Sequence, residues 1–186
     1  MRKNIGPKSL IYPEPVLVIG TYDEKGKANA MTAAWGGISD TNEVCVCLSN
    51  NHKTTKNILK KKAFTIAIGT HKLTKECDYL GMVSGNDEPN KLEKCKLHVY
   101  KSKHVDAPII KEFEMSLECE LIKYERKSGH TFAKIKNIVV DDSILTNGKV
   151  DIKKLDPIIY DNDTYGYYTI GKKVGDAYSI YKKVKA

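Results

Sequence analysis

The stretch VLVIGTYDEKGKANAMTAAW, residues 16–35, determines the fold expected for this chain. Its first part, VLVIGTYD, is a run of β-branched and aliphatic residues typical of a buried strand. DEKGK then supplies charged residues and a glycine, which favour a turn. ANAMTAAW alternates loosely between small and larger residues. The stretch therefore predicts two antiparallel strands joined by a short turn.

Strand patterns dominate the rest of the chain. EVCVCLS (43–49) predicts a third strand of an antiparallel meander, with GGISD (36–40) as a break before it. Four more strands are predicted from FTIAIGT (64–70), LHVYKSKH (97–104), SLECELIKYERKSG (116–129) and TFAKIKNIVVDD (131–142). We therefore expect one mainly β domain over residues 1–186, an antiparallel β-barrel with a few peripheral helices.

Two segments have the period of short helices. HKTTKNILKKKA (52–63) predicts a helix with Thr54 as its N-cap and an apolar stripe of Ile58, Leu59 and Ala63. HKLTKECDYLGM (71–82) predicts a second helix that ends near Gly81. The polar stretch VSGNDEPNKLEKC (83–95) follows and predicts a long loop.

Composition and charge restrict the classes of function. The chain has 186 residues, of which 41% are hydrophobic and 29% charged, as in globular proteins. No apolar run approaches the ~20 residues of a transmembrane helix, and the run from Val16 to Ile19 is too short for a signal peptide. We therefore expect a cytoplasmic protein without a membrane partner.

The net charge of +8 admits a nucleic acid, an anionic cofactor or simply a lysine-rich composition. The basic residues are spread along the chain without the aromatic interleaving of an RNA-binding segment. Nucleic acid is therefore the weaker interpretation, while a positive surface would still attract phosphorylated ligands.

The five cysteines form no CxxC pair, and no metal site is predicted. The favoured interpretation is that the cysteines are small buried hydrophobic residues.

SNNHKTTKN (49–57) lies where a strand passes into a helix. The N-terminus of a helix presents unpaired N–H groups and partial positive charge, and Lys53, Thr54 and Thr55 add a cation and hydroxyl groups. This combination is what a phosphate group requires. An ordinary capped surface helix is the alternative, and the absence of a Walker pattern argues against an NTPase.

Four weaker patterns each have a structural explanation beside the functional one. Ser84-Gly85 and Lys91 belong to a loop that either covers a ligand or is simply mobile, and His130 either contacts a ligand or is a structural histidine. Tyr165 and its neighbours offer flat amphipathic surface, for a ligand, the core or a dimer interface. Trp35, the single tryptophan, lies among small residues that either leave room for a flat ligand or let the indole fill the core. No Ser-His-Asp set or paired carboxylates are apparent, so a cofactor is expected to carry any chemistry.

Read in order, these segments resemble the flavin reductase-like family with its FMN-binding split barrel, most closely the flavoredoxin branch. The resemblance covers residues 15–175, and its most specific parts are Asn-x-x-Thr-x-x-Trp (29–35) and Lys-Thr-x-x-Asn-Ile (53–58). It implies an antiparallel split β-barrel, non-covalent FMN in a groove at a homodimer interface, and NADH or NADPH as a transient donor. The implied cofactor-binding residues are Asn29, Thr32, Ala33, Ala34 and Trp35 on the isoalloxazine and ribityl side, Ser49, Lys53, Thr54 and Asn57 on the ribityl and phosphate side, and Lys91, His130 and Tyr165 nearby.

The sequence departs from the family pattern at two positions. His52 stands where relatives often have arginine, and a neutral histidine there would weaken the phosphate site and make it depend on pH. Leu92 replaces an aromatic residue in the loop that follows Ser84-Gly85, which changes how the loop packs on the flavin. The catalytic residues, if any, are not identified by the sequence.

Two functions follow from the resemblance, and a third from charge alone. An NAD(P)H-dependent flavin reductase would stack a nicotinamide on the flavin for hydride transfer. A non-enzymatic carrier would instead pass electrons through bound FMN between redox proteins. A basic nucleic-acid-binding barrel without cofactor is the third hypothesis.

Overall fold

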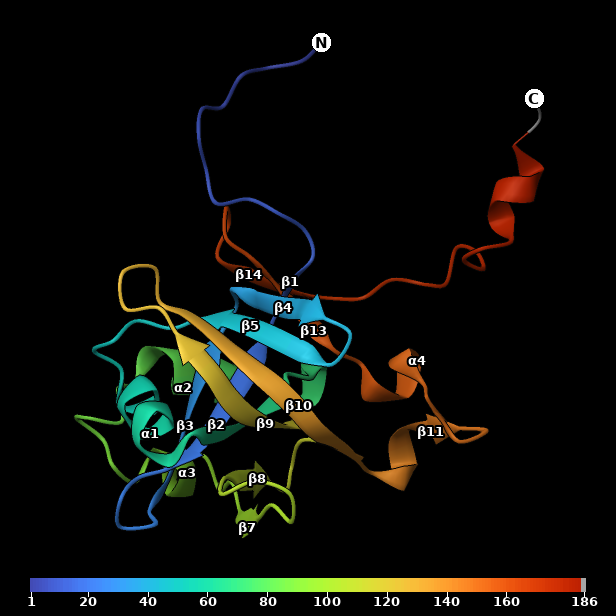
Figure 1. Ribbon diagram of the computed structural model, residues 1–186. Coiled ribbons are helices and arrows are strands. Elements are labelled where there is room, and N and C mark those ends of the chain that lie inside the picture. The colour runs from blue at the N-terminus through green and yellow to red at the C-terminus, as the bar shows by residue number, and fades with distance from the viewer. Residues whose placement is uncertain (185–186) are drawn as a thin grey trace.

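The structure is a computed structural model that describes residues 1–184 (Figure 1). A curled antiparallel sheet of seven strands, in the order β3-β2-β6-β9-β10-β5-β4, forms the barrel. Its strands are β2 (Leu17–Tyr22), β3 (Ala28–Ala33), β4 (Gly36–Asp40), β5 (Glu43–Cys47), β6 (Ala63–Ile68), β9 (Met115–Tyr124) and β10 (His130–Val140). The predicted mainly β antiparallel barrel with peripheral helices is thereby confirmed.

Smaller elements surround the barrel. The α-helices are α1 (Lys53–Lys61), α2 (Thr74–Met82), α3 (Lys91–Lys94) and α4 (Ile152–Leu155), and the short 3-10 helices are η1 (His71–Leu73), η2 (Asp142–Ile144) and η3 (Ile180–Lys183). The remaining strands are β1 (Glu14–Pro15), β7 (Val99–Lys101), β8 (Pro108–Ile110), β11 (Leu145–Thr146), β12 (Lys149–Val150), β13 (Ile158–Asp161) and β14 (Gly166–Thr169). α1 and α2 both pack against the edge of the barrel formed by β2 and β3 (Figure 1).

The β2–β3 hairpin forms as the sequence predicts. Its register runs from Leu17 opposite Ala33 to Tyr22 opposite Ala28. In the turn, the Asp23 carboxylate accepts hydrogen bonds from the backbone N–H groups of Lys25 and Lys27, both at 2.9 Å. Gly26 adopts a φ of +79°, which favours glycine, so DEKGK holds the turn by local bonds alone.

The continuous apolar run at the start of β2 is explained by burial on both faces. Leu17 and Ile19 belong to the core inside the barrel, together with Phe64 and Ile58. Val16 and Val18 face the opposite way, into a second core covered by α2, α3 and the segment before β9. Because neither face meets water, the strand shows no alternation of polar and apolar residues.

The predicted meander is wrong in its third step. GGISD does not break the sheet but forms β4, which pairs with β5 as a hairpin. This hairpin lies at the far edge of the sheet, where β5 pairs with β10 instead of β3. The chain therefore crosses between the two edges after β3, a long-range pairing that local sequence patterns do not specify.

The first helix is present, but its capping and its buried face differ from the prediction. His52 occupies the N-cap position, whereas Thr54 lies inside the helix and is 1% exposed. Ala63 lies outside the helix, at the start of β6. The buried residues of the helix are Thr54, Thr55, Asn57 and Ile58. A helix that buries three polar side chains needs hydrogen-bond partners for them, and these partners build the site described below.

The structure also bears on the predictions for the loop after α2, the cysteines and a membrane helix. The loop after α2 contains the short helix α3, and of the cysteines only Cys77 and Cys119 are buried. Among residues 1–184, no helix is long and apolar enough to cross a membrane. The single domain over 1–186 stays a prediction, and its last two residues lie outside the described range.

Candidate functional site

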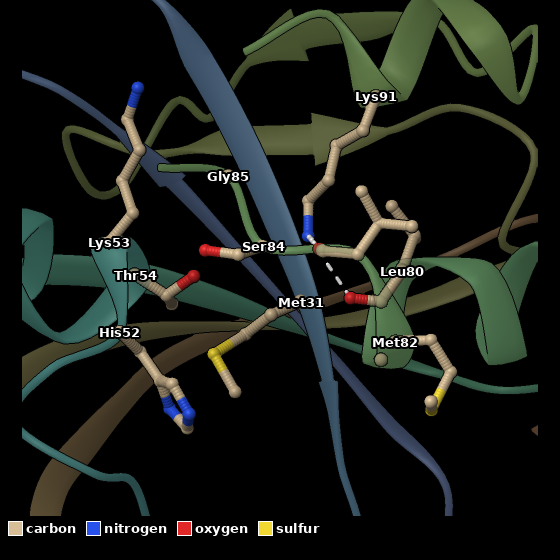
Figure 2. A pocket seen from close by; sticks show the side chains of 11 residues that line it. Met31, His52, Lys53, Thr54, Leu80, Met82, Ser84, Gly85 and Lys91 are labelled. Carbon is tan, nitrogen blue, oxygen red and sulfur yellow. Dashed lines mark hydrogen bonds between the residues drawn. The ribbon is translucent and has the colours of Figure 1, made fainter. Parts of the chain in front are cut away.

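Several predicted site residues surround a hollow of about 180 Å³ beside the N-terminal end of α1 (Figure 2). The hollow is lined by Met31, His52, Lys53, Thr54, Leu80, Gly81, Met82, Val83, Ser84, Gly85 and Lys91. These residues come from β3, α1, the end of α2, the following loop and α3. The lining includes two lysines but no carboxylate, so its charge favours an anion.

The backbone at the start of α1 adds to this positive character. The N-cap residue His52 makes no side-chain hydrogen bond to the first turn, and this turn contains no acidic residue. The Thr55 hydroxyl donates to the Ser49 carbonyl at 2.7 Å, which fixes the turn that leads into the helix. The N–H groups of the first turn therefore lack an acidic or capping side chain, the condition under which a helix N-terminus binds an anion.

Thr54 connects α1 to Asn29 of β3, which in turn contacts the loop after α2. Its hydroxyl accepts a 2.8 Å hydrogen bond from Asn29 Nδ2, and both side chains are buried. Gly85 packs so closely on Asn29 that a Cβ at that position would lie 2.1 Å from Asn29 Oδ1. A glycine is therefore required for the loop to approach β3, and Asn29 holds Thr54 at the wall of the hollow.

Lys91 enters the hollow from α3 and closes the C-terminal end of α2 (Figure 2). Its Nζ donates to the carbonyls of Leu80 at 3.0 Å and Val83 at 2.7 Å, and the residue is 2% exposed. Burial lowers its pKa from 10.5 to about 8. An ammonium at this end of a helix is also favoured by the helix dipole, and its third hydrogen is left for another acceptor.

Lys53 and His52 respond differently to their surroundings. Lys53 extends away from Met31 in Figure 2, and its Nζ lies 3.8 Å from the Asp23 carboxylate in the β2–β3 turn. Burial and the nearby charge of Lys91 lower the pKa of His52. The neutral imidazole is thus favoured over the charged form.

A second group of predicted residues lines another hollow, of about 230 Å³. Its lining combines the predicted residues Thr32, Ala33, Ala34 and Tyr165 with Val16, Asp78, Tyr160 and Tyr167. The Thr32 hydroxyl donates to the Cys77 carbonyl at 2.6 Å and fixes α2 against β3. Small and aromatic side chains thus line the same hollow, a composition that suits a flat ligand.

Trp35, Ser49 and His130 line a third hollow, of about 540 Å³, between the end of β5 and the β9–β10 turn. Trp35 is 53% exposed, so it does not fill a core gap. The Trp35 carbonyl accepts from Cys47 N–H at 2.8 Å, which fixes the backbone beside His130. Within a single chain, these residues line a different hollow from the one at α1.

Asn57 lies on the buried side of α1, where its Nδ2 donates to the Thr21 hydroxyl at 3.0 Å. Its predicted role as a cofactor ligand stays a prediction. Sequence patterns missed Met31, Gly81 and Met82 as lining residues, since nothing in their local sequence distinguishes them. Ser84 and Gly85 carried a weak signal as a polar loop, but their position against Asn29 follows only from tertiary packing.

The curled seven-stranded sheet has two edge strands, β3 and β4, and is flanked by α1 and α2. This fold is a split β-barrel. The chain belongs to the flavin reductase-like family, because residues 9–169 match the flavin reductase like domain. This confirms the resemblance found in the sequence.

Individual relatives cover most of the chain. It is 35% identical to the flavoredoxin of Desulfovibrio vulgaris (Miyazaki F), with a TM-score of 0.92 over 96% of this chain and 98% of that one. A flavoredoxin from Methanosarcina acetivorans is 28% identical, with a TM-score of 0.88 over 98% of each chain. An uncharacterized protein of Archaeoglobus fulgidus is 32% identical over 146 residues, 76% of this chain and 80% of that protein.

Proposed function

We propose that this protein binds FMN non-covalently, with the phosphate at the N-terminal end of α1 and the isoalloxazine ring further along β3. The observation that carries the proposal is the hollow at α1, where Lys53, Thr54 and Lys91 line a space without carboxylates beside an uncapped helix N-terminus. Its volume of about 180 Å³ is below the ~300 Å³ at which ligand pockets typically begin, so it suits the phosphate end of a cofactor.

The direction of the cofactor follows from β3. The Asn29 side chain bonds to Thr54 at the first hollow, while Thr32, Ala33 and Ala34 line the second. At ~3.3 Å per residue, the path from Asn29 to Ala34 spans roughly 17 Å, enough for a molecule as long as FMN. The ring then lies at the small residues, with Tyr165 opposite, and the ribityl chain connects the two hollows.

Bound FMN supplies the redox chemistry, and the residues of this chain bind and orient it. Thr54 and the α1 N–H groups hold the phosphate, and Lys53 exchanges its long contact with Asp23 for it. Our first proposal is an NAD(P)H-dependent flavin reductase that passes a hydride or electrons through FMN. The similarity to two proteins named flavoredoxin supports a second proposal, a carrier between redox proteins.

A spectrum of the purified protein separates these proposals. FMN absorbance at one flavin per chain is expected in both cases, while direct bleaching by NADH or NADPH without oxygen identifies the reductase. A carrier stays oxidised under these conditions and is reduced by a redox protein. A protein that cannot be reconstituted with FMN would contradict both.

The phosphate position is tested by Lys53→Ala, with Lys56→Ala as the matched control because Lys56 is exposed on the same helix. A charge-assisted hydrogen bond contributes about 1.5–3 kcal/mol, so Lys53→Ala should weaken FMN binding by about one to two decades. Riboflavin, which lacks the phosphate, should bind all three proteins alike. Equal weakening of riboflavin and FMN would show that Lys53 does not contact the phosphate.

We also propose a cytoplasmic homodimer. Trp35, Ser49 and His130 line a hollow separate from the one at α1, and a second copy would bring them to the flavin. A groove between two chains encloses a large flat cofactor better than the interior of a small barrel. A monomer by light scattering, with FMN fully bound, would contradict this proposal.

A further inference from the structure

Residues 170–184 form a carboxy-terminal arm that leaves β14 and extends away from the barrel (Figure 1). Within the described chain, the hydrogen bonds of residues 171–184 join residues of the arm to each other. Ile180 N–H and the Ser179 hydroxyl both donate to the Asp176 carbonyl at 3.1 Å. Among the described residues, the arm therefore has local structure but no hydrogen bond to its own barrel.

The arm carries large apolar side chains that are mostly exposed. Val174 is 88% exposed, Tyr178 96%, Tyr181 64% and Val184 79%. Exposed apolar groups of this size mark a surface that binds another molecule. Extended at ~3.3 Å per residue, residues 171–184 span up to ~45 Å, compared with a radius of gyration of ~16 Å for a domain of this length. The arm can therefore reach across a neighbouring copy.

A groove of about 480 Å³ on the barrel has complementary chemistry. Its lining includes Ile11, Tyr12 and Trp35, which are 77%, 54% and 53% exposed. It also includes Glu14, which is only 3% exposed and whose Oε2 has no hydrogen-bond partner within the described chain. A buried carboxylate oxygen without a donor is costly unless a ligand supplies one.

The arm can supply such a donor. Its sequence, GKKVGDAYSIYKKV, holds four lysines and one aspartate, whereas Glu14 is the only carboxylate that lines the groove. We propose that the carboxy-terminal arm of one copy of this chain docks in the Trp35 groove of a second copy, with its tyrosines on the apolar lining and a lysine at Glu14. The inference rests on the homodimer of the proposed function and adds the contact that holds it together.

The test uses apo-protein, so that flavin does not quench Trp35, the only tryptophan. The full chain is compared with a chain that ends at Ile170, and with Tyr178→Ser/Tyr181→Ser in the full chain. Ile152→Ser is the matched control, because Ile152 is 54% exposed on α4. The readouts are the dimer dissociation constant from sedimentation and the emission maximum of Trp35.

Loss of the arm should raise the dimer dissociation constant roughly 100-fold or more, because each dimer loses two aromatic anchors per arm. Trp35 emission should shift to the red in the same variants, and on dilution of the full chain, whereas Ile152→Ser should resemble the unaltered protein. A synthetic peptide of residues 170–184, which contains no tryptophan, should restore the blue-shifted emission of the truncated chain. Glu14→Gln in that chain should weaken the peptide about tenfold, as expected for a lost charge-assisted bond.

Three results would overturn the inference. An unchanged dissociation constant would show that the arm does not hold the dimer. An emission maximum of Trp35 that does not change on truncation, or on addition of the peptide, would show that the arm docks elsewhere. Blue-shifted emission that survives dilution to monomers would show that the arm folds onto its own chain. FMN titration is scored separately, so a failure to bind flavin would contradict the proposed cofactor without affecting these outcomes.

Discussion

Lys91→Met should make the protein progressively less stable, relative to the unaltered chain, as pH rises above 8. Methionine has a similar length but no charge and no N–H group, so the carbonyls of Leu80 and Val83 lose their donor. Each unpaired carbonyl costs about 1–3 kcal/mol at any pH. The variant also removes a buried ammonium, and this second effect depends on pH.

The direction of this pH dependence follows from the pKa of Lys91, which burial lowers from 10.5 to about 8. Below pH 8 the lysine is charged in both states, and the folded protein bears the full cost of burying the charge. Between pH 8 and 10.5 the folded protein holds the neutral amine while the unfolded chain keeps its proton, so stability from this group rises with pH. The unfolding free energy of the unaltered protein, relative to that of Lys91→Met, should therefore increase by about 1.4 kcal/mol per pH unit, to roughly 3 kcal/mol.

Urea denaturation of both proteins at pH 7, 8, 9 and 10 measures this difference. The contributions of the other titrating groups cancel in it, because both proteins contain them. Lys94→Met is the control, because Lys94 lies on the same helix but is exposed, and its pKa is raised by the Glu88 carboxylate. Its difference should therefore stay nearly constant from pH 7 to 10, because the pKa of Lys94 is at or above 10.5 in both states and its contribution is lost only at higher pH. A difference for Lys91→Met that is constant or falls between pH 8 and 10 would refute burial of the ammonium.

Three further outcomes are expected at the site. Gly85→Ala should lower the affinity for FMN and for riboflavin together, since a Cβ would lie 2.1 Å from Asn29 Oδ1 and displace the loop; unchanged titration curves would contradict this close approach. Thr54→Val should cost about 1–3 kcal/mol in unfolding free energy by leaving Asn29 Nδ2 buried without its acceptor, whereas a change below ~0.5 kcal/mol would contradict the buried bond. FMN should quench most of the Trp35 emission at one flavin per chain, and unchanged emission at saturation would place Trp35 away from the ring.

Local sequence determined the elements whose partners lie nearby. The β2–β3 hairpin follows from an apolar run, a DEKGK turn and a second strand, because the turn is held by bonds within five residues. The proposal of an anion site at the start of α1 also rests on local sequence, since the end of a helix leaves N–H groups unpaired whatever surrounds it. The order of motifs then indicated the family and, by resemblance, the candidate cofactor residues.

Tertiary structure alone decided which of those residues share a space. It placed β4 and β5 at the far edge of the sheet from β3, so that Trp35 and His130 line a hollow separate from Lys53 and Thr54. It also made Thr54 a buried partner of Asn29 instead of a cap, a contact across 25 positions. Pairing of distant strands and burial of polar groups depend on the whole packed core, and no local pattern of residues encodes them.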